Sequence, residues 1–87
     1  MDKILKNKIE EKIQETISNK NEIKQLFQSL SSMDDSRSFV LGIIVGRIYN
    51  SFYYQSKRIL NREPTAEEFC EFVEFVKSKK SNFENLW

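Results

Sequence analysis

The sequence contains no histidine, and only one cysteine, one proline and two glycines occur among its 87 residues. Without histidine the chain lacks the commonest general base and transition-metal ligand. The lone cysteine, Cys70, excludes a disulfide within the chain, and the scarcity of proline and glycine predicts few turns and long helices. We therefore predict no enzyme activity, no catalytic or metal-binding residue and no cofactor.

Long apolar segments are also missing. The longest apolar run, residues 39–45, is far shorter than the roughly 20 residues that a membrane-spanning helix needs. The beginning of the chain, MDKILKNKIEEK, is charged throughout, unlike a signal peptide. Together with the free cysteine it favours a cytoplasmic protein without membrane contact. The net charge of +1, from 14 basic and 13 acidic residues, argues against non-specific binding of nucleic acid over the whole protein surface.

Apolar residues recur at helical spacing in the first third of the chain. They form one stripe, with charged residues opposite, at Leu5, Ile9, Ile13, Ile17, Ile23, Phe27 and Leu30. The polar stretch SNKNE interrupts this stripe, but the phase continues across it. The pattern therefore favours a single helix over residues 3–30.

Two further helices follow in the sequence. Asp34, Asp35 or Ser36 can cap a second helix over residues 35–61. Thr65 and Glu68 have the spacing of a capping box, which places the start of a third helix at residue 66. This third helix runs to residue 80, and its apolar phase continues to residue 87. The predicted fold is a single all-α domain over residues 1–87, a three-helix bundle in which a helical hairpin carries a shorter third helix.

The second helix is apolar on two opposite sides in its first half. One side has an ordinary core pattern, with Leu41, Val45, Ile48, Tyr49, Phe52, Ile59 and Leu60, and the other side begins with Val40, Ile43 and Ile44. A helix that is apolar all round is covered all round. We therefore predict that residues 39–45 are buried on both sides, by the first helix on one side and by the C-terminal tail or a second copy of the chain on the other.

The two glycines, Gly42 and Gly46, lie inside this run. Each costs about 1 kcal/mol relative to alanine in a helix interior, and small residues at this spacing let another backbone approach closely. Packing by the protein's own helix and contact with a partner chain both fit this pattern. The candidates for an oligomer contact are Val40, Gly42, Ile43, Ile44 and Gly46.

The second half of the same helix is basic and aromatic. Its candidates for binding nucleic acid or an acidic protein surface are Arg47, Tyr54, Lys57, Arg58 and Arg62. Arginine contacts phosphate and tyrosine can stack on bases. The acids that follow, Glu63, Glu67, Glu68, Glu71 and Glu74, offer another explanation, because ion pairs across the turn would produce the same cluster without a ligand.

Other polar residues have simple structural interpretations. Arg47 lies between apolar residues, and its candidate partners are Asp34, Asp35 or an acid of a partner chain; the alternative is a surface arginine with its stem on apolar neighbours. Glu67, Glu71 and Glu74 share one face of the third helix, which we interpret as a solvated face. Cys70 lies inside an apolar pattern, which predicts a small core or boundary residue.

The tail contains Phe83, Leu86 and Trp87 at the spacing of anchors that dock into a partner's groove. The same residues could close the protein's own core or contact a second copy. Taken together, the sequence predicts a non-enzymatic protein–protein interaction module that self-associates as a homodimer or binds another protein. The alternatives are a nucleic-acid-binding regulator and a small accessory or inhibitor protein that docks through its tail.

Overall fold

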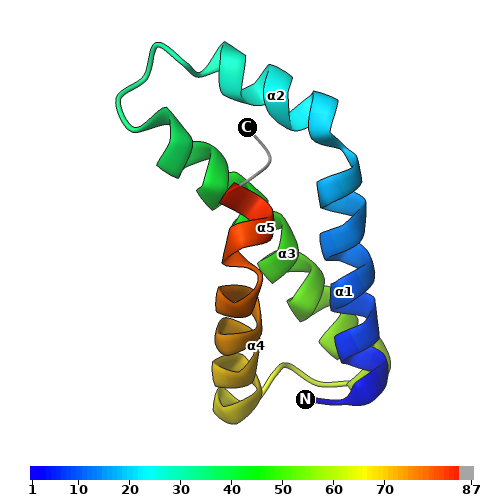
Figure 1. Cartoon of the computed structure of the whole chain (residues 1–87). Coiled ribbons are helices and arrows are strands. Elements are labelled where there is room, and N and C mark those ends of the chain that lie inside the picture. The colour runs from blue at the N-terminus through cyan, green and yellow to red at the C-terminus, as the bar shows by residue number, and fades with distance from the viewer. Residues whose placement is uncertain (85–87) are drawn as a thin grey trace.

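The computed structural model describes residues 1–84, and these form helices without any strand. The helices are α1 (Lys3–Ser18), α2 (Lys20–Ser29), α3 (Ser36–Leu60), α4 (Ala66–Ser78) and α5 (Lys80–Glu84). In Figure 1, α1 and α2 form a bent arm, α3 returns antiparallel to α1, and α4 with α5 runs back along α3. The all-α helical bundle predicted from the sequence is confirmed. The molecule is elongated, with extents of 41 × 22 × 20 Å.

The single helix predicted over residues 3–30 is wrong, because the chain breaks at Asn19. This residue leaves the helical conformation, with φ −87° and ψ 43°, and its N–H donates to the carbonyl of Thr16 at 3.2 Å. The residues around Asn19, from Ser18 to Glu22, are polar and exposed, so they add little apolar burial, and most helical stability comes from such burial. The break turns α2 so that Ile23, only 5% exposed, packs into the core.

The core lies mainly between α1 and α3. Its α3 residues recur every fourth position, and the buried hydrophobic side chains are Leu5, Ile9, Ile13, Ile23, Val40, Ile44, Ile48, Phe52, Phe72 and Phe83. This row corrects the sequence interpretation, since Val40 and Ile44 were oligomer candidates but are 0% and 3% exposed. The reason is that α1 crosses α3 along an i, i+4 ridge, a common mode of helix packing.

A layer of aromatic rings separates α4 from α3. The rings of Phe52 and Phe72 are stacked with centroids 4.3 Å apart. Tyr49 lies against Phe69 edge-on and against Phe72 at a tilt, with centroid distances of 6.1 and 6.0 Å. The sequence pattern places Tyr49 on the core face, yet it is 40% exposed, because it lies at the edge of this layer.

The helix ends follow the sequence only in part. The capping box of Thr65 and Glu68 is confirmed: each side chain bonds to the other residue's backbone N–H. Asp35 occupies the N-cap position of α3, but its left-handed backbone (φ 55°) differs from the extended conformation of ordinary N-caps. Its side chain accordingly makes no capping hydrogen bond to the described backbone. Asn61, also left-handed (φ 58°), ends α3.

The third predicted helix is interrupted near its end. It stops at Ser78 rather than at residue 80, and α5 follows after Lys79, whose backbone is not helical. Phe83 in α5 is 1% exposed and belongs to the chain's own core. Leu86 and Trp87 lie outside the described residues. Within residues 1–84, no helix combines the length and the apolar character that crossing a membrane requires.

Candidate interaction surface

The outer face of α3 is the side of this helix turned away from the core. We define it by the residues Phe39, Gly42, Ile43, Gly46, Tyr49, Asn50 and Tyr53. Phe39 is 49% exposed and Ile43 is 42% exposed. No described residue covers this side, so its predicted cover by a second copy, or by tail residues that lie outside the described part of the chain, stays a prediction. An exposed row of large apolar and aromatic side chains marks a candidate interaction surface.

Both glycines lie on this outer face and are exposed. A Cβ atom added to Gly42 or Gly46 would meet no atom of another described residue within 4 Å. Close packing of the glycines by the protein's own helix is therefore wrong. Contact with a partner chain remains a prediction, because a single chain does not test it.

An apolar hollow borders the outer face where α3 meets α4. It has a volume of about 200 Å³, and its lining is Val45, Tyr49, Phe69, Phe72, Val73, Val76 and the stem of Lys77. Phe69 on its rim is 41% exposed. Partial burial, followed by the neighbouring Tyr53, raises the pKa of the Tyr49 phenol. The tyrosine therefore stays neutral at physiological pH and adds an uncharged aromatic ring to the surface.

Arg47 pairs with an acid that sequence reasoning did not consider. Its guanidinium donates to the Glu15 carboxylate of α1 at 2.8 Å, and neither Asp34 nor Asp35 is its partner. The Arg47 side chain is 36% exposed, so this is a surface contact that joins two helices. Because Glu15 and Arg47 lie far apart in the sequence, only the packing of α1 on α3 reveals the pair.

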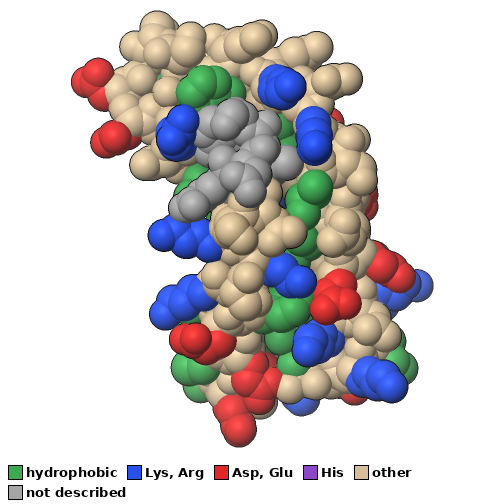
Figure 2. All heavy atoms as spheres, in the orientation of Figure 1, with side chains coloured by type: hydrophobic (Ala, Val, Ile, Leu, Met, Phe, Trp, Pro, Cys, Tyr) green, Lys and Arg blue, Asp and Glu red, His purple; other side chains and the backbone are tan. Residues whose placement is uncertain are grey.

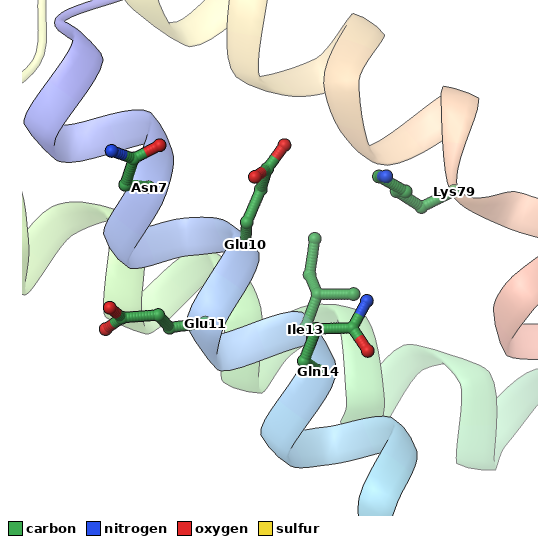
Figure 3. Close-up of a pocket in the computed structure, with 6 residues that line it drawn as sticks. All are labelled: Asn7, Glu10, Glu11, Ile13, Gln14 and Lys79. Atoms are coloured by element: carbon green, nitrogen blue, oxygen red, sulfur yellow. The ribbon is translucent and has the colours of Figure 1, made fainter.

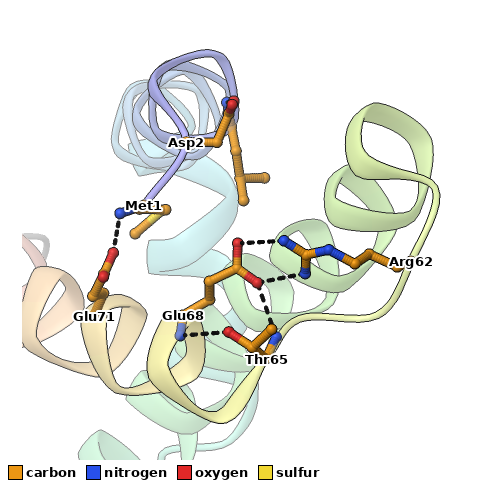
Figure 4. A network of polar contacts seen from close by, with 7 residues as sticks. Met1, Asp2, Arg62, Thr65, Glu68 and Glu71 are labelled. Atoms are coloured by element: carbon orange, nitrogen blue, oxygen red, sulfur yellow. Dashed lines mark hydrogen bonds and ion pairs between the residues drawn. The ribbon is translucent and has the colours of Figure 1, made fainter.

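Arg62 and Glu68 form the best-defined polar site (Figure 4). Arg62 donates to both carboxylate oxygens of Glu68, at 2.6 and 3.2 Å, and the same carboxylate accepts the backbone N–H of Thr65 at 2.9 Å. The Arg62 hydrogen bonds, and then the Thr65 N–H, lower the pKa of Glu68 to about 2. The same contact raises the pKa of Arg62. The ion-pair interpretation is thus confirmed for Arg62.

Lys57 and Arg58 are the two remaining basic candidates in this region. Lys57 pairs with Glu63 at 3.7 Å, as the ion-pair interpretation predicts. Arg58 is exposed, and no acid in the described part of the chain pairs with it. Tyr54 is 63% exposed and lies one turn before Arg58. Within residues 1–84, Arg47, Lys57 and Arg62 are therefore engaged in ion pairs, whereas Arg58, next to the exposed Tyr54, is not.

The acids of α4 and Cys70 are at the surface. Glu71 pairs with the amino group of Met1 (Figure 4), and Glu74 lies 3.4 Å from Lys77. Cys70 is exposed, so its predicted core or boundary position is wrong. α4 buries a narrow stripe with Phe72 as its only fully buried side chain among described residues, which leaves Cys70 outside. Within residues 1–84, no cluster of three or more acids and cysteines could hold a metal ion.

A polar hollow of about 600 Å³ lies between α1 and the corner where α4 meets α5. Figure 3 shows Glu10 on α1 and Lys79 on opposite sides of it, with Asn7, Glu11 and Gln14 around the opening. The Lys79 ammonium lies over the Phe75 ring, 5.5 Å from its centroid. In the view of Figure 2, acidic and basic side chains are interspersed along α1 and α4. This mixed charge favours no ligand class.

Comparison with models of protein families, with curated proteins and with solved structures finds no match. Function must therefore be argued from the residues. Sequence reasoning identified Gly42, Ile43 and Gly46 on the candidate surface, but it missed Phe39, Tyr49, Asn50 and Tyr53. Counting every fourth residue from Val40 would have identified the buried row and left these residues on the opposite side.

Proposed function

We propose that this protein is a non-enzymatic protein–protein interaction module that self-associates through the outer face of α3. The observation that carries the proposal is the exposure of Phe39, Ile43 and Tyr49, at 49%, 42% and 40%, on one side of one helix. Aromatic residues are enriched in interfaces and charged residues are depleted at their centres. The outer face has this composition, because every member from Phe39 to Tyr53 is uncharged.

Self-association would also offset two features that destabilise the isolated chain, its small buried surface and the glycines inside α3. A domain of this size buries only about 60% of its unfolded surface and is marginal alone. Gly42 and Gly46 each lower helix stability by about 1 kcal/mol relative to alanine, and no described neighbour uses the space that they leave. A second chain that packs closely on α3 would bury the apolar residues and use that space.

The alternatives are less well supported. Nucleic-acid binding would use Tyr54 and Arg58, since the other basic candidates already hold acids. Docking through the tail would require Phe83, which is 1% exposed. The outer face instead exposes three large apolar or aromatic side chains, Phe39, Ile43 and Tyr49.

The test compares two isoleucine substitutions by sedimentation analysis at micromolar concentration. The variant Ile43→Lys should shift the protein from dimer to monomer, because a lysine charge at the centre of an apolar contact must be desolvated, with affinity falling at least about tenfold. The matched control is Ile4→Lys, since Ile4 is 59% exposed on α1 and outside the outer face. Circular dichroism checks that both variants fold. A monomeric wild type, or equal loss in both variants, would reject the proposal.

A further inference from the structure

We infer that the partner is a second copy of this chain, lying antiparallel on the outer face of α3 with the two-fold axis passing at Gly46. The inference rests on the proposed function, which already names a second copy, and adds the orientation and register in which the two copies pair. In a two-fold contact the same patch is used on both copies, so residues equally far from the axis on either side meet. The outer face is arranged symmetrically about Gly46 in this sense.

The first support is the order of residue types along the outer face. Phe39 and Tyr53 lie at equal distances from Gly46 in the sequence, and so do Asp35 and Lys57. The Phe39 N–H donates to the Asp35 carbonyl at 3.0 Å, so Asp35 lies one helical turn before Phe39. Antiparallel pairing at Gly46 therefore places aromatic rings opposite each other and opposite charges at both ends.

The second support is steric. At the axis Gly46 would face Gly46 of the second copy, and the absence of both side chains lets the two backbones approach closely. Gly42 lies one turn away, and by the same rule it faces Asn50 of the second copy, with the Tyr49 ring of that copy one residue nearer the axis. No described atom lies within 4 Å of a Cβ placed on Gly42, so the space beside Gly42 can take a side chain of the second copy. Tyr49 is 40% exposed, so its ring can contact the second copy.

The third support is electrostatic and selects the orientation. Asp35 is exposed and uses its side chain for no described capping bond. The Lys57 side chain is 60% exposed, and its ammonium lies 3.7 Å from the Glu63 carboxylate, which is a long distance for an ion pair. A parallel pair would bring Asp35 to Asp35 and Lys57 to Lys57, whereas an antiparallel pair joins acid to base twice. The antiparallel arrangement also opposes the two helix dipoles.

Charge exchange tests the register in the full chain. Asp35→Lys and Lys57→Asp should each weaken dimerisation about tenfold by sedimentation analysis, because each places like charges together at both ends. The double variant Asp35→Lys with Lys57→Asp should recover most of the loss, since the pairs are restored with reversed sign. The control Glu11→Lys changes an exposed acid of α1 and should leave the affinity unchanged.

Cross-linking tests the position of the axis. With Cys70→Ser to remove the native thiol, Gly46→Cys should form a disulfide-linked dimer on mild oxidation, because a residue on a two-fold axis meets itself. The control Gln25→Cys, on exposed α2 surface, should not cross-link at the same rate.

The outcomes separate this inference from the proposed function. A dimer that shows neither rescue by charge exchange nor cross-linking at Gly46 overturns the register and leaves the interaction module standing. A wild type that stays monomeric overturns both. Rescue together with selective cross-linking supports the antiparallel dimer.

Discussion

At the scale of single residues, two buried side-chain atoms in the described part of the chain lack a hydrogen-bond partner, Gln55 Oε1 and Ser56 Oγ, and of these two residues only Ser56 is itself fully buried. Ser56 is fully buried in α3, and its hydroxyl has no hydrogen-bond partner among the described residues. Thr16, the other buried hydroxyl residue, donates to the carbonyl of Lys12 at 2.8 Å. A buried polar group without a partner costs about 1–3 kcal/mol. Ser56 continues the row of Val40, Ile44, Ile48 and Phe52, so its small side chain rather than its polarity suits the packing.

We predict that Ser56→Ala stabilises the protein by about 1 kcal/mol, because it removes the unpaired hydroxyl and leaves almost the same volume. Urea unfolding followed by circular dichroism measures the change. The control is Ser51→Ala, in the same helix at a half-buried position, which has the same gain in helix propensity. If both variants gain equally, propensity explains the effect and the buried hydroxyl does not.

Pairing of individual residues was predictable where the partners are close in the sequence. Arg62 and Glu68 lie on either side of one turn, and their pairing followed from the local order of charges. The partner of Arg47 is Glu15, which is remote in the chain, so no local spacing indicated it. The exposure of Cys70 was not predictable for a related reason, because it depends on how narrow a stripe α4 buries.

At the scale of elements, the Glu68 carboxylate stabilises the start of α4 through two sets of hydrogen bonds. Glu68 completes the capping box with Thr65 and also accepts both hydrogen bonds from Arg62. The side chain is 14% exposed, so the contact is shielded from solvent more than most ion pairs of this protein. The carboxylate thus joins the end of the connection after α3 to the first turn of α4.

This site predicts a specific pH dependence. The folded pKa of Glu68 is about 2, below its ordinary value of 4.5, so its contribution to stability is present above that value and is lost as the pH falls towards 2. Glu68→Gln keeps a capping-box residue but no charge. It should be less stable than wild type at neutral pH, and the difference should shrink between about pH 5 and pH 2.

The measurement is urea unfolding of both proteins across that pH range. Glu67→Gln serves as the control, because Glu67 is an exposed acid of the same turn. A constant difference between wild type and Glu68→Gln at all pH values would mean that the charge of Glu68 is not responsible.

Element boundaries were predictable where a side chain defines them. Thr65 and Glu68 identified the start of α4 because a capping box is a local pattern with two reciprocal bonds. The break at Asn19 has no such signal, since its side chain makes no capping bond to the described backbone. There the chain bends and α2 runs over α3 in a different direction from α1 (Figure 1), and packing direction is not encoded in local spacing.

At the scale of the whole molecule, the choice of buried face was the least predictable feature. Apolar residues occur on several sides of α3, so a helical wheel alone allows more than one core. The structure buries the row that includes Val40 and Ile44 and leaves Phe39 and Ile43 outside. This choice depends on where α1 and α4 lie around α3, which is a property of the assembled bundle. The same choice creates the candidate interaction surface.

The aromatic layer between α3 and α4 has a consequence for local opening of the fold. Backbone contact is closest between α1 and α3, whereas α4 is held to α3 mainly through the rings of Tyr49, Phe52, Phe69 and Phe72. Regions with fewer close contacts open at lower free energy than the rest. We expect the amide hydrogens of α4 to exchange with solvent deuterium before those of α1 and α3. Exchange followed residue by residue by NMR measures this order, and equal protection in all three helices would contradict it.

If α4 exchanges first, the bundle consists of a persistent α1–α3 pair and a more readily released α4, joined through a small set of rings.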